Sequence, residues 1–454
     1  MPSIKILEQD LTTGGGRISE VNIVYVPGFM SNATNANAAE CAWPVEGVKA
    51  DTQYAAKKRT PTLCSSVAEF EKYFGLKPAV FDSTPGSEKY DLSYIYAKEL
   101  LSLGLPVLYE SLNDVTDEPK EEDFKIAIND KDLPLFDRLS DLGNYQFKYV
   151  TSGGYPLYVP SSATNASDAT FKKMAKLALD RGDCIALIDH GESVQDTAGK
   201  KLKLPEMYER ICVDTKDMDG ADCSAMFTPW INVDCVSHKP FGKDSNNHPN
   251  KNITFALPPS FAYLSAFAKS LKTNASWLAV AGATRGQVPN LNGVDPLSLT
   301  GEQLSNSVAE SFQNRGDKSN KPVSINAITN IKPFGHRIWG NRTLKDNSLE
   351  GNLTATSFLN TRNMICDVKK VVYDACRKYT FEQNNDVLWL NFKSYVEPTL
   401  EKMKAGAGIS GYKITKGDTA EKAKLVANIK LYPIYPVEDF EITVQMLDDE
   451  ISVS

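Results

Sequence analysis

A short polar run after an apolar segment is the first place where the residue types could support catalysis. Asp189 and His190 end the segment DCIALIDH at 183–190, and Ser193 follows three residues later. An acid, a histidine and a serine can form a hydrolytic triad, but its serine usually lies at a tight turn of the type Gly-x-Ser-x-Gly. Ser193 lacks that context. The sequence therefore favours a structural role for His190 at the end of a strand, with an α/β enzyme near Asp189 and His190 as the alternative.

A second group of candidate residues could bind a metal ion. These are the cysteines and histidines of the region 212–248, namely Cys212, Cys223, Cys235, His238 and His248. Only Cys235 and His238 have close ligand spacing, and no second pair supports a zinc site. The eight cysteines are scattered, and the N-terminus does not have the layout of a signal peptide. We therefore interpret them as free thiols in a reducing compartment, and predict no metal.

Nucleotide and cofactor sites are also not predicted. The glycines at 14–16 lack a following Lys-Ser or Lys-Thr, and the segment 191–200 lacks the spacing of a phosphate-binding loop. Four histidines in 454 residues provide little general-base capacity. The sequence thus shows no catalytic constellation, and we expect a protein that is not an enzyme.

Composition excludes two further classes of protein. The hydrophobic content of 42% and the charged content of 24% are typical of a globular chain long enough for several cores. The net charge of −7 argues against a general nucleic-acid binder, which would be basic. The chain has no apolar run of about 18 residues, so we expect no membrane insertion.

Charge is distributed unevenly along the chain. Residues 321–436 contain 18 Lys and Arg against 10 Asp and Glu, a balance of +8. Residues 437–454 contain 6 acidic and no basic residues. A basic region followed by an acidic tail suggests complementary contacts between subunits or with an acidic partner. The alternative is that both are simply solvated surfaces.

The first two thirds of the chain alternate between helical and strand patterns. This alternation, with strands that are apolar throughout, predicts an α/β domain with a mainly parallel sheet. Between these units, residues 116–158 and 193–252 have a polar, mixed pattern and are predicted to be loop insertions. The predicted strands are 21–28, 105–111, 183–190 and 276–283, and the predicted helices are 65–75, 92–103, 168–181 and 259–271.

The last third has a different, α+β pattern. Residues 324–344 predict two strands joined by a turn at Pro333 and Gly335. Apolar residues at three- and four-residue spacing then predict a helix over 360–379 and a second helix that ends at Gly406. Another alternating strand is predicted over 424–431.

Both ends of the chain have strand patterns that are separated from the body by glycine-rich or proline-rich joints. The N-terminal pattern includes Ile4, Ile6 and Leu7, and the C-terminal pattern, at 438–447, includes Phe440, Ile442 and Val444. A strand without a partner is a liability for a folded protein. Addition to the sheet of a neighbouring subunit would remove it, and pairing within the same chain is the alternative.

The C-terminal third resembles the C-terminal domain of contractile tail sheath proteins. The residues that carry this resemblance are Gly335, Trp339-Gly340-Asn341-Arg342-Thr343-Leu344, Arg362, Phe381-Glu382-Gln383-Asn384 and Leu388-Trp389. The helix at 65–75 is also similar to a helix of that family, through Ser66, Glu69, Phe70, Phe74 and Gly75. Asn341, where the family usually has a small residue, and Pro398 within the second helix depart from the family pattern.

The resemblance implies a structural subunit that polymerises as stacked rings into a helical tube around an inner tail tube. Contraction of this tube would use lattice strain and no nucleotide. The implied partners are other copies of the chain, the inner tube protein, and baseplate and tail terminator proteins. The implied location is a virion tail assembled in the bacterial cytoplasm, or, as an alternative, a bacterial injection or secretion particle.

The resemblance also implies a division of the chain. Residues 1–20 and 437–454 would be arms, 21–300 an outer α/β domain, and 301–436 an inner domain facing the tube. Six residues would belong to the inner domain or its tube-facing surface, namely Trp339, Arg342, Arg362, Lys369, Lys370 and Trp389. For Arg342, an ion pair at the edge of the core is the alternative.

Overall fold

The structure is a computed structural model of the 454-residue chain. It describes residues 22–31, 59–75, 78, 80–82, 89–115, 121–132, 134–158, 169–191, 204–215, 218–237, 254–294, 323–345 and 354–438. The predicted terminal strands, with Ile4, Ile6 and Leu7 at one end and Phe440, Ile442 and Val444 at the other, lie outside the described residues.

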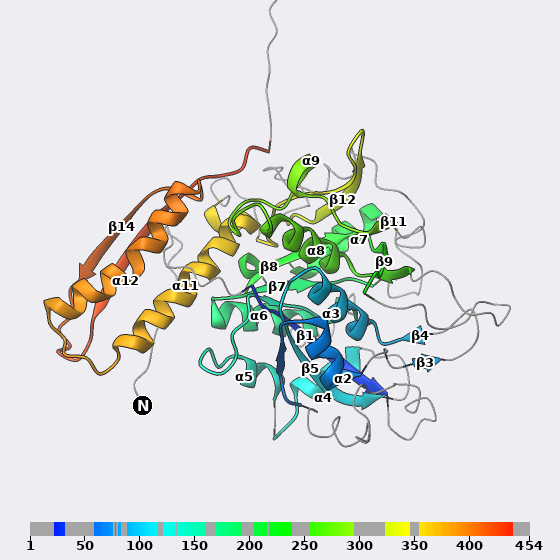
Figure 1. Cartoon of the computed structure of the whole chain (residues 1–454), viewed down its shortest axis with the longest axis horizontal. Coiled ribbons are helices and arrows are strands. Elements are labelled where there is room, and N and C mark those ends of the chain that lie inside the picture. The colour runs from blue at the N-terminus through cyan, green and yellow to red at the C-terminus, as the bar shows by residue number, and fades with distance from the viewer. Residues whose placement is uncertain are drawn as a thin grey trace, which may run out of the picture.

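An eight-stranded sheet with the order β13-β12-β8-β7-β6-β1-β5-β2 is the centre of the fold (Figure 1). The strands from β12 to β5 in this order pair in parallel, and only the edge strands β13 and β2 pair antiparallel. This confirms the predicted mainly parallel sheet. The strands are β1 (Val24–Ser31), β2 (Thr62–Cys64), β5 (Val107–Val115), β6 (Tyr149–Val150), β7 (Ile185–Ile188), β8 (Ser224–Thr228), β12 (Asn326–Ile331) and β13 (Gly335–Trp339).

Helices cover both faces of this sheet because its inner strands are apolar on both sides. All residues of β7 and β8 are buried, as expected for parallel strands. The helices α4, α5, α6 and α7 pack on one face, and α2, α3 and α8 pack on the other. Their bounds are α2 (Val67–Phe74), α3 (Leu92–Ser102), α4 (Glu121–Ile128), α5 (Leu135–Leu139), α6 (Thr170–Arg181), α7 (Leu204–Thr215) and α8 (Pro259–Leu271).

The helix α2 shows why the sequence folds as predicted at this point. Its N-cap, Ser66, accepts a hydrogen bond from the Glu69 backbone at 3.2 Å, and the Glu69 side chain accepts one from the Ser65 backbone at 2.8 Å. Gly75 ends the helix with a φ of 89°, a conformation that favours glycine. The two buried residues, Phe70 and Phe74, are one turn apart and face the sheet.

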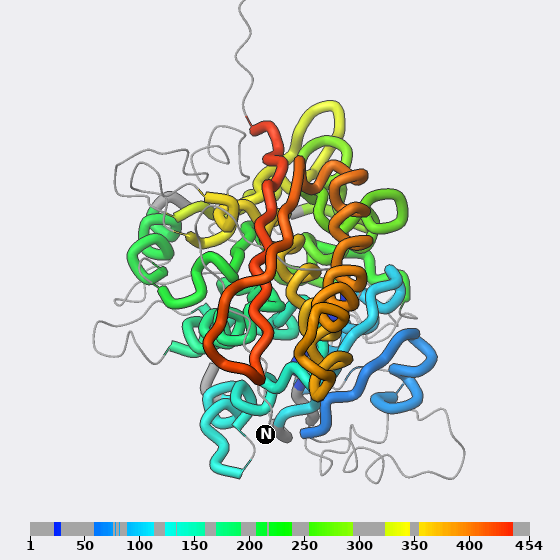
Figure 2. Tube along the Cα trace, turned by 90° about the vertical axis from the view of Figure 1, so that its left-hand side faces the viewer, coloured from blue at the N-terminus to red at the C-terminus, as the bar shows by residue number. Residues whose placement is uncertain are grey.

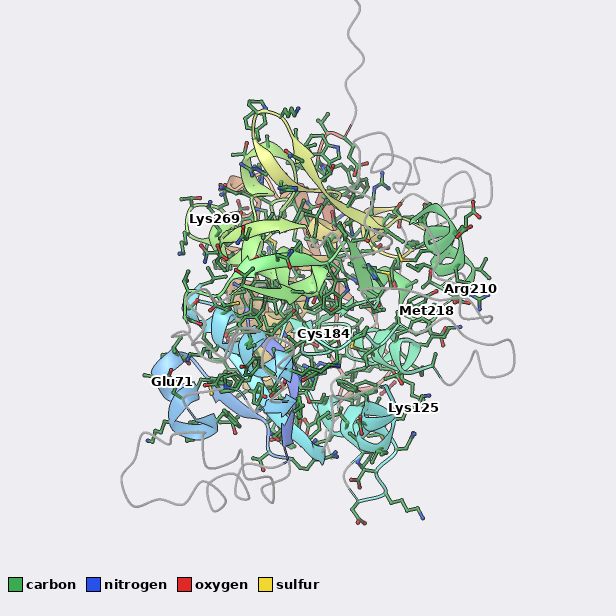
Figure 3. The ribbon with its side chains drawn as sticks, turned by 90° about the vertical axis from the view of Figure 1, so that its right-hand side faces the viewer. Glu71, Lys125, Cys184, Arg210, Met218 and Lys269 are labelled. Carbon is green, nitrogen blue, oxygen red and sulfur yellow. The ribbon has the colours of Figure 1, made fainter. Side chains whose placement is uncertain are left out.

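Smaller elements surround the sheet. Figure 3 shows the molecule from the side where they lie, with the buried Cys184 near the centre and Arg210 of α7 at the edge. They comprise a three-stranded sheet, a two-stranded sheet and two short helices. Their bounds are β10 (Thr254–Leu257), β9 (Ile231–Asp234), β11 (Leu291–Val294), β3 (Val80–Asp82), β4 (Lys89–Tyr90), η2 (Ala221–Cys223) and α9 (Gly282–Arg285).

The C-terminal part forms a separate layer beside the α/β body (Figure 1). It consists of η4 (Ala355–Ser357), α11 (Leu359–Tyr379), α12 (Asp386–Ala405) and an antiparallel pair, β14 (Ile409–Gly417) and β15 (Val426–Pro433). Figure 2 shows β14 and β15 on the outer side of the layer. The helix α11 joins the two parts, because Cys366 contributes to the body core while Met364 and Val368 contribute to the C-terminal core. Both predicted helices are confirmed, and α12 continues through Pro398.

The predicted strand at 276–283 was wrong. Trp277 is instead directed into the C-terminal core, where its Nε1 donates a hydrogen bond to the Gly406 carbonyl at 2.9 Å. Ala281 then caps the short helix α9. The apolar run 276–283 therefore forms no strand. It contributes Trp277 to the C-terminal core and Val280 to the core of the α/β body.

The predicted loop insertions were also wrong. Residues 116–158 contain α4, α5 and the central strand β6, and residues 193–252 contain α7 and the central strand β8. Furthermore, β12 pairs in parallel with β8, through Asn326 beside Phe227 and Ala327 beside Thr228. The sheet therefore continues past the predicted boundary between residues 300 and 301, and the division into outer and inner domains stays a prediction.

Candidate assembly interface

Asp189 and His190 are both fully buried and bonded to different groups. Asp189 accepts hydrogen bonds from the Ser260 backbone at 3.0 Å and from the Ser260 hydroxyl at 2.5 Å, and burial raises its pKa to about 7. His190 donates through Nδ1 to the Gly191 carbonyl at 2.7 Å, and its Nε2 lies 3.1 Å from the Thr228 hydroxyl. Burial lowers the pKa of His190 to about 4. Both side chains thus hold the ends of β7 and β8 and the start of α8 together, while Ser193 lies outside the described residues.

The three described cysteines of the candidate metal region are buried and lie against different groups. The Cys212 thiol lies 3.7 Å from the Val323 carbonyl, and the Cys235 thiol lies 3.6 Å from the Val233 carbonyl. Cys223 accepts a hydrogen bond from the Arg362 guanidinium. Within the described ranges, no three His, Cys, Asp or Glu side chains are grouped as metal ligands. His238 and His248 lie outside those ranges.

Buried ion pairs fix α11 to the α/β body. Lys148 lies 2.8 Å from Asp367, and Lys370 lies 2.6 Å from Asp183, with all four side chains at most 5% exposed. Asp183 also pairs with Arg181 at 2.9 Å. Burial alone would raise the pKa of Asp183, but Lys370 and Arg181 outweigh it and hold that pKa below its usual value. Each of these three cations therefore has a carboxylate partner within the same chain, and Lys370 and Arg181 share Asp183.

These contacts define where the predicted basic site residues lie. The Lys370 Nζ also donates to the Phe147 carbonyl at 2.6 Å, and Lys369 is buried beside Gly182. Arg362 is fully buried and pairs with Asp222 at 3.0 Å. Within the single chain the three side chains are thus directed at the α/β body, and their role on a tube-facing surface stays a prediction.

Arg342 lies at the root of the C-terminal segment. Its guanidinium pairs with the Glu438 carboxylate through two hydrogen bonds, one of them 3.1 Å long from Nε. The same guanidinium lies over the Phe358 ring at 4.5 Å, and the rings of Phe358 and Tyr435 are 5.1 Å apart. Arg342 therefore forms an ion pair at the edge of the core, which was the alternative prediction for this residue. This group of four residues fixes the last described residues, 435–438, to the rest of the structure.

The two tryptophans predicted for this region lie in different elements. Trp339 is half-buried at the end of β13, opposite Ala327 of β12. Trp389 is half-buried on α12 and stacks on Phe392 with ring centroids 6.1 Å apart. The structure therefore places Trp339 in the large sheet and Trp389 against the C-terminal core.

The β14–β15 pair has two outer edges with no third strand among the described residues. Its inner face packs on α12, where the Tyr412 hydroxyl donates to Glu401 at 2.6 Å and Leu431 is buried in the C-terminal core. The strand β14 was not predicted, because its sequence ISGYKITKG is interrupted by glycine. The alternation of Tyr412 and Ile414 with polar residues could have indicated this strand. Open strand edges are sites at which another strand can add.

A second exposed feature lies at the tip of the same layer. Phe381, Val387 and Leu390, in the α11–α12 connection and the first turns of α12, are 85%, 62% and 58% exposed. Val387 and Leu390 are three residues apart and so lie on the same side of α12, and exposed apolar side chains that adjoin each other are typical of interaction surfaces. The C-terminal layer thus combines open edges with exposed apolar residues. None of the helices in the described part of the chain has the length and hydropathy needed to cross a membrane.

The described part of the chain is thus an α/β body with a C-terminal layer of two helices and two strands. No protein-family model and no curated protein matches the chain. In fold it is similar to a chain of the anti-feeding prophage baseplate in its contracted state (18% identity, TM-score 0.59, covering 100% of this chain and 98% of that one). It is also similar to the contracted sheath complex of PVC, an extracellular contractile injection system (13% identity, TM-score 0.56, covering 99% and 98%). A third similar structure is the contracted helical sheath of the anti-feeding prophage (15% identity, TM-score 0.55, covering 98% and 99%). The chain therefore has the contractile sheath fold over its whole length.

Proposed function

We propose that this protein is the sheath subunit of a contractile particle and polymerises as stacked rings into a helical tube around an inner tube. The observation that carries the proposal is the fold similarity, which extends over 98–100% of this chain and includes a helical sheath. The open edges of β14 and β15 provide the second support, since a polymer needs sites that are unfilled in the single subunit.

We infer that the two arms, residues 1–20 and 437–454, link each subunit to its neighbours by strand addition. Residues 434–438 leave the end of β15 and run away from the β14–β15 pair (Figure 1). The ion pair between Arg342 and Glu438 fixes that direction. A C-terminal arm that starts there, away from its own hairpin, would add to the strand edge of a neighbouring subunit.

The work of contraction would come from strain in the extended lattice and would need no nucleotide. Such a mechanism needs two lattices of different free energy, built from one rigid subunit with flexible links. The buried ion pairs that fix α11 to the body support a rigid subunit. Asp189 and His190, by contrast, are buried and bonded to structural groups, which gives the alternative of an α/β enzyme no support.

The proposed partners are the inner tube, the baseplate and a tail terminator. We place the tube-facing surface on the inner domain, residues 301–436, where Val387 and Leu390 of α12 are exposed and Lys369 and Lys370 are buried. A phage tail and an injection particle share this design. The similar solved structures come from an extracellular contractile injection system and from the anti-feeding prophage, which makes an injection particle the second candidate.

Deletion of residues 1–12 tests the arm exchange. We expect the shortened protein to fold with the circular dichroism spectrum and melting temperature of the full chain, because the glycines at 14–16 predict a flexible joint between these residues and the first strand of the body. It should form no tubes at concentrations at which the full chain does. Normal tubes from the deletion variant would refute the proposed role of the N-terminal arm.

A further inference from the structure

A hairpin with only basic charges projects from one end of the α/β body. The strands β12 and β13 are joined by a turn at residues 332–334, which lies at the top of the body in Figures 1 and 3. The helix α9 and residues 286–287 lie beside β13, where the Ile338 backbone donates to the Gly286 carbonyl at 2.9 Å. The stretches 269–294 and 323–345, which contain all these elements, have seven Lys and Arg residues and no Asp or Glu.

Most of these positive charges are not neutralised within the described part of the chain. The Arg337 Nε donates to the Ala283 carbonyl at 3.0 Å, and the Arg285 Nε donates to the Ala279 carbonyl at 2.7 Å. These acceptors carry no net charge. Partial burial and the adjacent Arg337 lower the pKa of His336, as expected in a positive environment. Five of the seven basic residues have no carboxylate partner among the described residues, namely Lys269, Lys272, Arg285, Lys332 and Arg337.

The turn of the hairpin also has an exposed aromatic ring. Phe334 is 51% exposed, next to the exposed Lys332. At the side of the hairpin, the exposed Lys269 donates to the Gln287 side chain at 2.6 Å. An exposed aromatic anchor with charged residues around it is typical of a protein interface, and its charge selects an acidic partner. We call the surface formed by Lys269, Lys332, Phe334 and Arg337 the hairpin tip.

The opposite end of the same body is acidic. The helices α4 and α5 lie at the bottom in Figure 1, and Figure 3 shows Lys125 of α4 there, far from the hairpin. Residues 121–141 contain seven acidic and three basic residues. Asp132 and Asp137 are exposed and have no cationic partner among the described residues, and Ile126 is 62% exposed. This acidic surface therefore complements the hairpin tip in both charge and apolar character.

We propose that the hairpin tip of one copy, through Lys332 and Phe334, docks on the acidic surface of a second copy, at Ile126, Asp132 and Asp137. The two surfaces lie at opposite ends of one body, so they cannot form a symmetric dimer through a single patch. They form a head-to-tail contact, which continues from copy to copy as an open polymer. The inference rests on the proposed function, because the second copy is the next subunit of that polymer, and it uses surfaces of the body only.

Cross-linking from the hairpin tip tests this contact in the full-length protein. The variant Phe334→p-benzoylphenylalanine, a photoreactive residue, is mixed with nitrogen-15-labelled protein so that mass identifies cross-links between copies. We expect cross-links from position 334 to residues 121–141 of the second copy. The matched control is Phe381→p-benzoylphenylalanine, which is 85% exposed in the C-terminal layer and should not reach those residues. Cross-links between copies that are confined to other regions, or none at all, would overturn the proposal.

Charge reversal tests whether the charges determine the recognition. We expect Lys269→Glu/Lys332→Glu to raise the threshold concentration for tubes about tenfold, and Asp132→Lys/Asp137→Lys to do the same. A chain with all four substitutions should regain the wild-type threshold, because both surfaces are then reversed together. Circular dichroism would establish that each variant is folded. A fourfold variant that polymerises no better than either double variant would contradict the charge pairing.

The two proposals fail in different ways. Cross-links from position 334 to residues 121–141 in a protein that forms no tubes under any condition would support the head-to-tail contact and contradict the sheath function. Tubes that give no such cross-link would leave the sheath function intact and contradict the head-to-tail contact.

Discussion

Individual buried charges hold the two parts of this subunit together. Lys370 lies between the Asp183 carboxylate and the Phe147 carbonyl, at 2.6 Å from each. The net contribution of such an ion pair to stability is small, since both charges were removed from water. Loss of only one partner is costly, because it leaves the other charge buried without compensation. Asp183 retains Arg181 as a second cation, which limits that cost.

We predict that Lys370→Met lowers the free energy of unfolding by about 3 kcal/mol, because it removes one charge from this buried network. Chemical denaturation followed by circular dichroism would measure the change. The matched control is Lys176→Met, which removes an exposed pair with Asp180 at 3.5 Å and should change stability by no more than about 0.5 kcal/mol. Equal effects of the two substitutions would show that the pair at Lys370 is not buried in solution.

We predict that Asp189 makes stability depend on pH. Burial raises the pKa of Asp189 in the folded chain to about 7, from an ordinary value of 3.8. The contribution of Asp189 to the free energy of unfolding is therefore complete below its ordinary pKa and is lost as the pH rises through 7. Between about pH 5 and pH 8 the loss amounts to roughly 2 kcal/mol.

Asp189→Asn should remove this loss, since the amide does not ionise: its oxygen can accept the bond from the Ser260 backbone and its NH2 group can donate to the Ser260 hydroxyl. The measurement is the free energy of unfolding of wild type and variant across that pH range, with the exposed Asp180→Asn as the control. A variant with the same pH profile as the wild type would contradict the assigned ionisation.

The burial of Lys369 and Lys370 could not be predicted from the sequence alone. Lys369 and Lys370 lie between apolar positions of an amphipathic pattern, where a lysine is expected to face solvent. The structure buries α11 on two sides, against the body through Cys366 and against the C-terminal core through Met364 and Val368. Helical periodicity can identify one buried face of a helix. It cannot predict a helix such as α11, which is buried against two cores on different sides.

At the scale of elements, the turn between α12 and β14 depends on a close approach to Trp277. A Cβ atom added at Gly408 would lie 2.6 Å from the Trp277 Cδ1 atom. We therefore predict that Gly408→Ala lowers the free energy of unfolding by about 2 kcal/mol, through overpacking that displaces the indole. Chemical denaturation followed by circular dichroism would measure the lost stability.

The control for this prediction is Gly411→Ala in the same hairpin. There an added Cβ atom would lie 3.7 Å from Tyr432, an ordinary contact. Its effect should remain below about 1 kcal/mol. A harmless Gly408→Ala would mean that the α12–β14 turn does not pack on Trp277.

Element type was predictable where one periodic pattern dominated. The strands β12 and β13 and the helices α11 and α12 match their predictions, because their apolar residues have a single clear period. The strands β6 and β8 were missed since β6 has two residues and β8, SAMFT, is buried on both faces without alternation. At 276–283 a strand was predicted from an apolar run, but no strand forms there. Trp277 in this run instead packs in the C-terminal core and donates a hydrogen bond to the Gly406 carbonyl.

At the scale of the whole molecule, the chain is an α/β body with a firmly attached C-terminal layer that presents unfilled edges. This arrangement is suited to a lattice in which subunits move as rigid units and stay linked by their arms. The motif around Trp339 and Arg342 indicated the sheath fold from sequence, and the fold similarity supports it along the whole chain. The candidate interface was less predictable from the sequence. It depends on the open edges of the β14–β15 pair, which exist only once these strands have paired and packed on α12.

Electron microscopy of the purified full-length protein at increasing concentration tests the sheath function most directly. We predict hollow tubes of stacked rings above a threshold concentration, formed without any added nucleotide. Discrete particles at every concentration and salt condition, from a protein that is folded by circular dichroism, would contradict it.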